Sequence, residues 1–366
     1  MKTSFLLFAA ALGAACPALA ESPTSVRPFE APIVLGTRHL IHSPALREPR
    51  EINVRLPASY ADTKANRSYP VLYVLDGGVD QDFPHIAGLA QHGEISGTFD
   101  EFIVVGITTT TKRIWELTFP TRDERYITYI RPDGQPARFG TGGGSDRFRR
   151  FLAEEAIPFI EGKYRTSGRR TLMGESLAGL FVVDTLLRRP GLFNDYIAIS
   201  PSLWWNREEL GERAAAMLKA NDYSDRRLYL TMANEGGTMR RGLDRLVAAL
   251  RTPAAGALKW TWIDRRHSEH HGSIYHLAAL DALRTLYPVP YRPGSPLPWL
   301  WIGEMPKLGE AAEADKKIPC TAQRARRVTF AEVEADPAKW EALCVLSPLG
   351  QAPEPREWSR NWSARP

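Results

Sequence analysis

The stretch Thr171–Leu180, TLMGESLAGL, joins a short apolar run, a serine between small residues and the start of an apolar helical segment. A nucleophilic serine on a sharp strand-to-helix turn requires this combination, because the residues two positions before and after it crowd each other. Gly174 and Ala178 occupy those positions, with Ala178 standing where the usual pattern has glycine. We therefore interpret Ser176 as a nucleophile; the alternative is a serine N-cap that opens an ordinary buried helix.

Strand-like and helical segments alternate on either side of this stretch. Short apolar or alternating runs predict strands, at residues 51–56, 71–75, 102–107, 171–173, 196–199, 228–232 and 259–263. Helical periodicity appears between them, at residues 145–164, 177–188, 237–250 and 273–286, with a kink expected at Pro158. Strands buried on both faces and separated by helices predict an α/β fold, with a mostly parallel central sheet and helices on both faces.

A nucleophilic serine needs a general base and an acid that orients it. His271 follows the last predicted strand and opens the last predicted helix, so we interpret it as the base, with His270 as the alternative. The acid of this fold class lies between serine and histidine in chain order. Glu235 is the first carboxylate after the strand at 228–232 and is our choice, with Asp264 as the alternative.

The histidine lies in a tract that has other possible uses. His267, His270 and His276 surround it, and Glu269 is close in sequence. Histidine and glutamate at short spacing can bind zinc, so a metal site is an open alternative. No second group of ligands is evident elsewhere in the sequence, and we expect no metal and no other cofactor.

Several segments resemble the group of α/β hydrolases that includes esterase D and the siderophore trilactone esterases, with the mycolyl transferases as distant relatives. The matching pieces are GESLAGLFVVDTLLRRPGLFNDYIAISPSLWW at 174–205, YPVLYVLDG at 69–77, DRFRRFLAEEAIPFIEGKYRT at 146–166 and HGS at 271–273. The resemblance covers about residues 51–287 and implies an α/β-hydrolase fold and hydrolysis of carboxylic esters through an acyl-enzyme. It also implies that the backbone N–H groups of Leu177 and Gly78 form the oxyanion hole, with Gly77 as the fallback for Gly78.

The substrate is less defined than the reaction. Arg113, Trp204 and Trp205 are candidates for the wall of the substrate pocket. Core packing is the alternative for the tryptophans, and an ion pair with Glu116 is the alternative for Arg113. The expected substrate is a small-molecule ester; a siderophore (catecholate trilactone) esterase, an acyltransferase of the same fold and a non-catalytic binding protein on a hydrolase scaffold stay open.

The first residues have the pattern of a secretory signal peptide. A lysine start, an apolar run at 4–15 and the motif Ala18-Leu19-Ala20 predict cleavage between Ala20 and Glu21, and hence a periplasmic or secreted protein. A lipoprotein attached through Cys16 is the alternative. The mature chain then keeps Cys320 and Cys344, which an oxidising compartment would join in a disulfide.

Composition and the remaining chain set further limits. The net charge of +5 on 366 residues is modest and the basic residues are scattered, which argues against a nucleic-acid partner. No segment after the leader has the length of a membrane span. We expect a signal peptide at 1–20, the hydrolase domain at 21–287 and a Pro/Trp-rich extension at 288–366, docked on the hydrolase or forming a small module; the oligomeric state stays open.

Overall fold

The computed structural model describes residues 31–121, 128–130, 135–138 and 142–289. The chain divides into two units, Met1–Val34 and Leu35–Pro366, and every described helix and strand belongs to the second. The predicted signal peptide, Cys320, Cys344 and nearly all of the predicted extension lie outside the described residues, so these expectations stay predictions.

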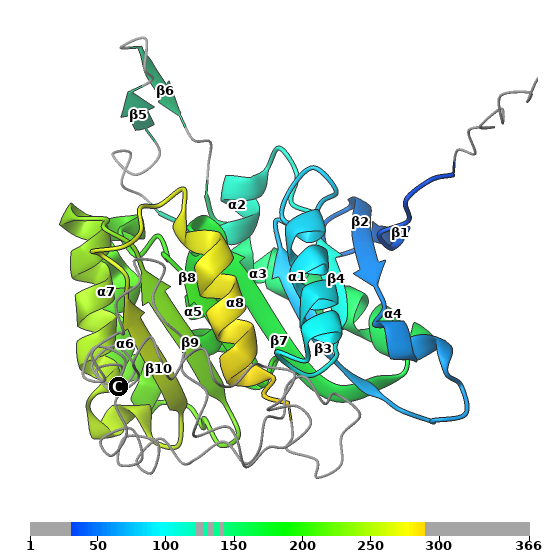
Figure 1. Ribbon diagram of the computed structural model, residues 1–366. Helices are drawn as coiled ribbons and strands as arrows, with labels where there is room; N and C mark the ends of the chain where they lie inside the picture. Colours follow the sequence, from blue (N-terminus) through cyan, green and yellow to red (C-terminus); the bar gives the residue numbers. More distant parts are fainter. Residues whose placement is uncertain (1–30, 122–127, 131–134, 139–141, 290–366) are drawn as a thin grey trace, which may run out of the picture. The chain divides into compact units, whose positions relative to one another are not determined.

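An eight-stranded sheet forms the centre of the second unit, in the order β1-β2-β4-β3-β7-β8-β9-β10 (Figure 1). Its strands are β1 (Thr37–Ser43), β2 (Glu48–Arg55), β3 (Tyr69–Leu75), β4 (Ile103–Ile107), β7 (Thr166–Glu175), β8 (Asp195–Ile199), β9 (Arg227–Met232) and β10 (Lys259–Asp264). The pairs β1–β2 and β2–β4 are antiparallel, and all other pairs are parallel. The predicted α/β class with a mostly parallel sheet is confirmed.

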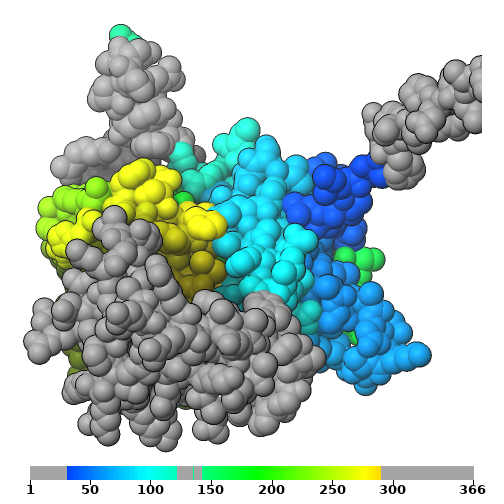
Figure 2. Space-filling view, viewed as in Figure 1, coloured from blue at the N-terminus to red at the C-terminus, as the bar shows by residue number. Residues whose placement is uncertain are grey.

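Helices cover both faces of this sheet. Helices α1 (Phe83–Ser96) and α8 (Ile274–Leu286) pack on one face, and the space-filling view shows them adjoining at the surface (Figure 2). The opposite face carries α3 (Ser145–Phe151), α4 (Ile157–Lys163), α5 (Leu177–Arg188), α6 (Trp205–Lys219) and α7 (Gly237–Leu250). Short 3-10 turns lie at Ala58–Ala61 (η1) and Pro253–Ala255 (η4).

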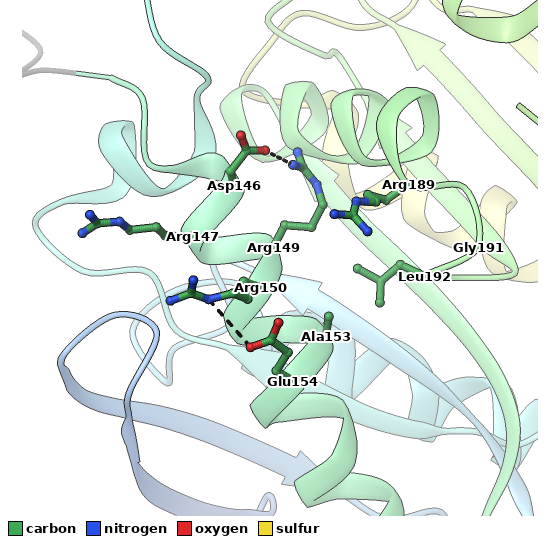
Figure 3. Close-up of a pocket in the computed structure, with 9 residues that line it drawn as sticks. All are labelled: Asp146, Arg147, Arg149, Arg150, Ala153, Glu154, Arg189, Gly191 and Leu192. Carbon is green, nitrogen blue, oxygen red and sulfur yellow. Dashed lines mark hydrogen bonds and ion pairs between the residues drawn. The ribbon is translucent and has the colours of Figure 1, made fainter. Parts of the chain in front are cut away.

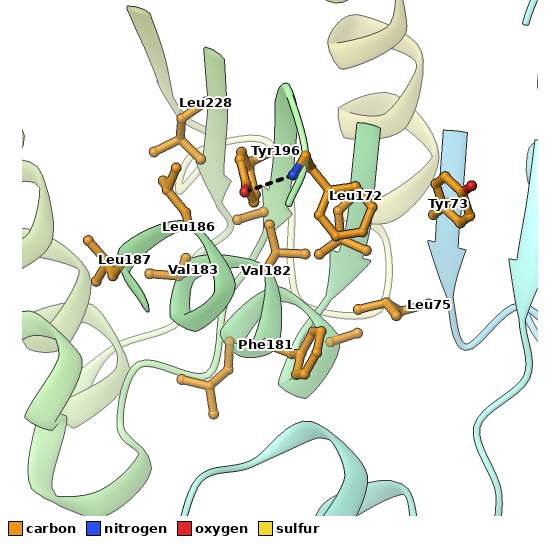
Figure 4. Packing of buried hydrophobic residues seen from close by; sticks show 14 of the residues in the cluster. Tyr73, Leu75, Leu172, Phe181, Val182, Val183, Leu186, Leu187, Tyr196 and Leu228 are labelled. Atoms are coloured by element: carbon orange, nitrogen blue, oxygen red, sulfur yellow. Dashed lines mark hydrogen bonds between the residues drawn. The ribbon is translucent and has the colours of Figure 1, made fainter. Parts of the chain in front are cut away.

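Alternation along the strands divides the core into two hydrophobic layers. Leu172 of β7 belongs to the layer under α5, whereas Met173 belongs to the layer under α1 and α8. Every residue of α5 from Leu177 to Leu187 is buried. Figure 4 shows Phe181, Val183 and Leu187 of this helix in the core. A helix of this kind packs against the centre of the sheet. Its burial holds the position of Ser176, the residue directly before it.

Two expectations about the chain were wrong in detail. The segment 145–164 is not one kinked helix: α3 passes into a π-helical turn, η3 (Leu152–Ala156), and then into α4. Pro158 directly follows this π-helical turn, in which the Ile157 N–H donates to the Leu152 carbonyl, and the chain is helical on both sides of the proline. The segment at 108–144, in which no helix or strand was expected, contains α2 (Arg113–Leu117) and the two-stranded sheet of β5 (Thr128–Ile130) and β6 (Pro136–Arg138).

Two glycines let the loop after β3 approach the end of β4. A Cβ atom on Gly77 would overlap the backbone of Gly106, and a Cβ on Gly106 would overlap the carbonyl of Gly77. The Gly77 N–H donates to the Ile107 carbonyl at 2.9 Å, which extends the sheet by one residue. This close approach fixes where the following residues, beginning with Gly78, leave the sheet.

No helix in the described part of the second unit combines the length and the apolar character that crossing a bilayer requires.

Candidate active site

Ser176 lies at the junction of β7 and α5 in a sharp turn with φ 59° and ψ −119°. A serine rarely adopts positive φ, so the surrounding structure must hold it. The Ser176 N–H donates to the Ile199 carbonyl at 3.0 Å, and its own carbonyl accepts the N–H of Ser202 at 2.9 Å. A Cβ on Gly174 would lie 2.6 Å from the Cβ of Ala178, which explains why both positions are small.

The predicted base and acid meet at the neighbouring end of the sheet. Glu235 follows β9 and His271 follows β10; because these strands are parallel neighbours, their carboxyl ends lie together. His271 Nδ1 is 2.6 Å from Glu235 Oε1. The hydrogen bond to Glu235 raises the pKa of His271 against the effect of burial, and the nearby Glu175 adds to the rise. Burial favours the neutral form of Glu235, but hydrogen bonding, chiefly from His271, lowers its pKa overall.

The alternative acid is engaged elsewhere. Asp264 accepts hydrogen bonds from Arg240 Nη2 at 3.0 Å and from Arg266 Nε at 2.8 Å. These two guanidinium groups outweigh desolvation and lower the pKa of Asp264. Of the two carboxylates that the sequence offered, Glu235 is the one in contact with the imidazole.

The serine hydroxyl does not contact the imidazole. Ser176 Oγ lies 3.3 Å from Ser202 Oγ, and within the described residues no hydrogen bond links Ser176 to His271. Catalytic hydrogen bonds are often long in free enzymes and tighten when substrate binds. The His271 side chain is 46% exposed.

The three predicted oxyanion donors differ in whether their N–H groups already have an acceptor. Leu177 is the first residue of α5, and its N–H has no acceptor among the described residues. Gly77, the fallback donor, is committed to the sheet through Ile107. Gly78 N–H donates to the side-chain oxygen of Gln81 at 2.9 Å. Of the two donors outside the sheet, the Leu177 N–H is free within the described structure and the Gly78 N–H is occupied.

Arg113, predicted near the substrate, is anchored at this end of the sheet. Its Nε and Nη2 donate to the two carboxylate oxygens of Asp76, each at 2.7 Å. The alternative partner was wrong, because Glu116 forms a buried ion pair with Arg50 at 2.5 Å. Arg113 remains 35% exposed, so part of its guanidinium still faces solvent.

The two tryptophans have different environments. Trp205 is 1% exposed, and its Nε1 donates to the Phe119 carbonyl at 2.8 Å. Its ring is a core side chain, so the pocket-wall interpretation is wrong for Trp205 and core packing describes it. Trp204 is partly buried and meets Trp205 edge-on, with ring centroids 5.7 Å apart. Its place in a substrate pocket stays a prediction.

Two carboxylates at the site were missed in the sequence. Burial raises the pKa of Glu175 to about 7, against the attraction of His271 and Arg113. Burial and the charge of Asp76 raise the pKa of Asp82 to about 6. Glu175 had one available signal, its position directly before Ser176; nothing in the sequence linked Asp82 to the site.

The other histidines have separate contacts. His276 Nδ1 lies 2.9 Å from Nε2 of His85, which joins α8 to α1. His270 Nδ1 accepts the N–H of Gly272 at 3.2 Å. Across the described ranges, no three His, Cys, Asp or Glu side chains are grouped as metal ligands would be.

A separate pocket of about 660 Å³ lies beside α3 and the loop after α5 (Figure 3). Its lining residues are Asp146, Arg147, Arg149, Arg150, Ala153, Glu154, Arg189, Gly191 and Leu192. None of the predicted site residues is among them, so we do not place the chemistry there.

Comparison with known proteins identifies the family of the chain. Residues 43–279 match the family described as "Putative esterase". Ferri-bacillibactin esterase BesA of Bacillus subtilis is 36% identical over 149 residues, covering 38% of this chain and 50% of the relative. The siderophore enterobactin esterase of Emericella nidulans is 32% identical over 173 residues, covering 44% and 56%. The chain thus spans about half the length of these curated relatives.

Solved structures agree with this family assignment. An IroE-like serine hydrolase from Shewanella oneidensis superposes with a TM-score of 0.59 at 28% identity, covering 69% of this chain and 80% of that one. The resemblance inferred from the residues is therefore confirmed. Because the family model spans most of the chain, this protein belongs to the esterase family of α/β hydrolases.

Proposed function

We propose that the protein hydrolyses carboxylic esters, with Ser176 as nucleophile, His271 as general base and Glu235 as the acid that orients it. The observation that carries this proposal is the 2.6 Å contact between His271 Nδ1 and Glu235 Oε1 beside the strained turn of Ser176. The contact fixes the tautomer in which Nε2 can accept the serine proton. Family membership supports the same reaction.

The reaction follows from these positions. Ser176 Oγ attacks the ester carbonyl carbon while its proton passes to His271 Nε2. Backbone N–H groups of Leu177 and Gly78 stabilise the negative oxygen of the tetrahedral intermediate. The carbon–oxygen bond to the alcohol breaks as the imidazolium returns the proton to the leaving oxygen. Water, deprotonated by the same imidazole, then attacks the acyl-enzyme, releasing the carboxylic acid and regenerating Ser176.

A siderophore ester is the first specific substrate to try. The relatives from Emericella nidulans and Aspergillus fumigatus are named as siderophore esterases, and the relative from Bacillus subtilis is named as a ferri-bacillibactin esterase. We also propose that residues 1–20 are a signal peptide and that the protein is periplasmic or secreted. An exported enzyme would meet siderophore esters outside the cytoplasm. Transfer of the acyl group to another acceptor would use the same residues.

Burst kinetics with p-nitrophenyl acetate test the proposal. Wild-type protein should release a burst of p-nitrophenol followed by a slower steady state, and Ser176→Ala and His271→Ala should lose both phases. His270→Ala is the matched control, because it removes a neighbouring imidazole outside the Glu235 contact. Activity that survives Ser176→Ala would refute the proposed nucleophile, and an inactive wild type would favour a binding protein on a hydrolase scaffold.

A substrate panel separates the finer alternatives. Short-chain aryl esters, a feruloylated sugar and a catecholate trilactone should be compared by kcat/KM on the same preparation. Turnover of the trilactone well above the aryl esters would support a siderophore esterase. No turnover of it would remove that alternative and leave general ester hydrolysis.

A further inference from the structure

The backbone N–H of Gly78 is occupied because of the conformation of the turn after β3. Gln81 N–H donates to the Gly78 carbonyl at 3.1 Å, which closes a turn over residues 78–81. The Gln81 side chain folds back over the same turn, and its Oε1 accepts the Gly78 N–H at 2.9 Å. A Cβ on Gly78 would lie 2.9 Å from this oxygen, so the carboxamide packs directly on the glycine.

The orientation of the carboxamide is fixed by its other end. Gln81 Nε2 donates to the carbonyl of Thr109 at 3.2 Å and lies 3.1 Å from its hydroxyl oxygen. A backbone carbonyl can only accept, so the amide nitrogen must face Thr109 and the oxygen must face Gly78. Thr109 in turn donates its hydroxyl to Asp76, which is held by both nitrogens of Arg113. A continuous chain of hydrogen bonds therefore holds Gln81 against Gly78.

We propose that Gln81 is a built-in occupant of the oxyanion hole, whose carboxamide oxygen holds the Gly78 N–H until the substrate carbonyl displaces it. The inference rests on the proposed function, in which Gly78 is an oxyanion donor. An amide oxygen is a close chemical stand-in for an ester carbonyl oxygen, since both accept one backbone N–H through an sp² lone pair. Because one N–H cannot serve both oxygens fully, every substrate must compete with Gln81.

This competition predicts a gain of activity on truncation. Gln81→Ala and the volume-matched Gln81→Met remove the competing oxygen and should raise kcat/KM for p-nitrophenyl acetate about threefold to tenfold, the worth of one net hydrogen bond. Both should also tighten inhibition by phenylboronic acid by a similar factor, because its serine adduct places a boronate oxygen in the oxyanion hole. Gln81→Glu should do the reverse, since a carboxylate accepts the N–H more strongly and repels the developing oxyanion.

The controls separate this inference from the proposed function. Gln91→Ala, an exposed glutamine on α1, should leave kcat/KM unchanged. Melting temperatures of all variants check that the turn still folds. If wild type is active and Ser176→Ala is not, but Gln81→Ala and Gln81→Met lower kcat/KM or leave it unchanged, Gln81 merely supports the loop and the inference is overturned. If Ser176→Ala keeps full activity, the proposed function itself fails.

Discussion

Removal of the Glu116 carboxylate should destabilise the protein strongly, because it is a buried charge with a buried partner. Arg50 and Glu116 are 1% and 0% exposed and lie 2.5 Å apart. Glu116 also accepts the N–H of Thr110 at 3.1 Å and its hydroxyl at 2.8 Å. Arg50 would keep only the partly exposed Glu48 carboxylate at 3.0 Å and the Thr108 carbonyl at 2.8 Å. Breaking a buried pair by removing one partner typically costs about 3–5 kcal/mol.

Glu116→Ala should therefore lower the free energy of unfolding by about 3–5 kcal/mol in urea denaturation. The matched control is Glu154→Ala, whose carboxylate is 63% exposed and 3.7 Å from Arg150. An exposed pair of this kind contributes at most about 1 kcal/mol. A loss below about 1 kcal/mol for Glu116→Ala, equal to that of the control, would refute the reasoning that burial sets the strength of these pairs.

Three further predictions concern the site and its support. Because the pKa of His271 is raised above 6.5, kcat/KM should fall as pH drops through a value above 6.5; Glu235→Gln removes the main cause and should move this limb to lower pH, measured with p-nitrophenyl acetate. An unmoved limb would mean that another group controls it. Gly77→Ala should cost about 1–3 kcal/mol of stability by overpacking, measured in urea. Phe181→Ala, a fully buried truncation, should cost about 3–5 kcal/mol in the same assay, and a smaller loss would show that the core collapses into the space.

The centre of the fold could be predicted from the sequence because its elements carry strong local patterns. Helix α5 was predicted with its observed bounds, Leu177–Arg188, since an apolar run with no polar face has one reasonable place against a sheet. Strand β7 was predicted only at 171–173 although it spans Thr166–Glu175. Its amino-terminal half is polar and partly exposed, so it pairs with β3 without an apolar signal.

Elements at the periphery could not be predicted in the same way. Strand β1 alternates mainly exposed with partly buried residues, and its pairing with β2 is a long-range contact. Helix α1 buries one face through Phe83, Ile86, Ala87, Ala90 and Gly93, but the small alanine and glycine side chains on this face give a weak apolar signal in the sequence. Tertiary packing determines such elements, and the local sequence has little influence on them.

The contact between His271 and Glu235 was predictable, because chain order places the two residues after neighbouring strands. Contacts were not predictable where a side chain has several possible partners in space. Arg113 could have met Glu116 three residues later, but it lies on Asp76 from another strand end. Trp204 and Trp205 are adjacent in sequence, and only packing distinguishes the core ring from the partly exposed one.

The burial of α5 has a consequence for how the protein responds to warming. Amide hydrogens of α5 and its flanking strands should exchange with solvent only on global unfolding, whereas the exposed loop carrying His271 can open by itself. Ser176 thus lies in a part of the molecule that opens only on global unfolding, whereas His271 lies in a part that opens locally. Reversible loss of turnover should then precede the cooperative melting transition, with the sheet still intact.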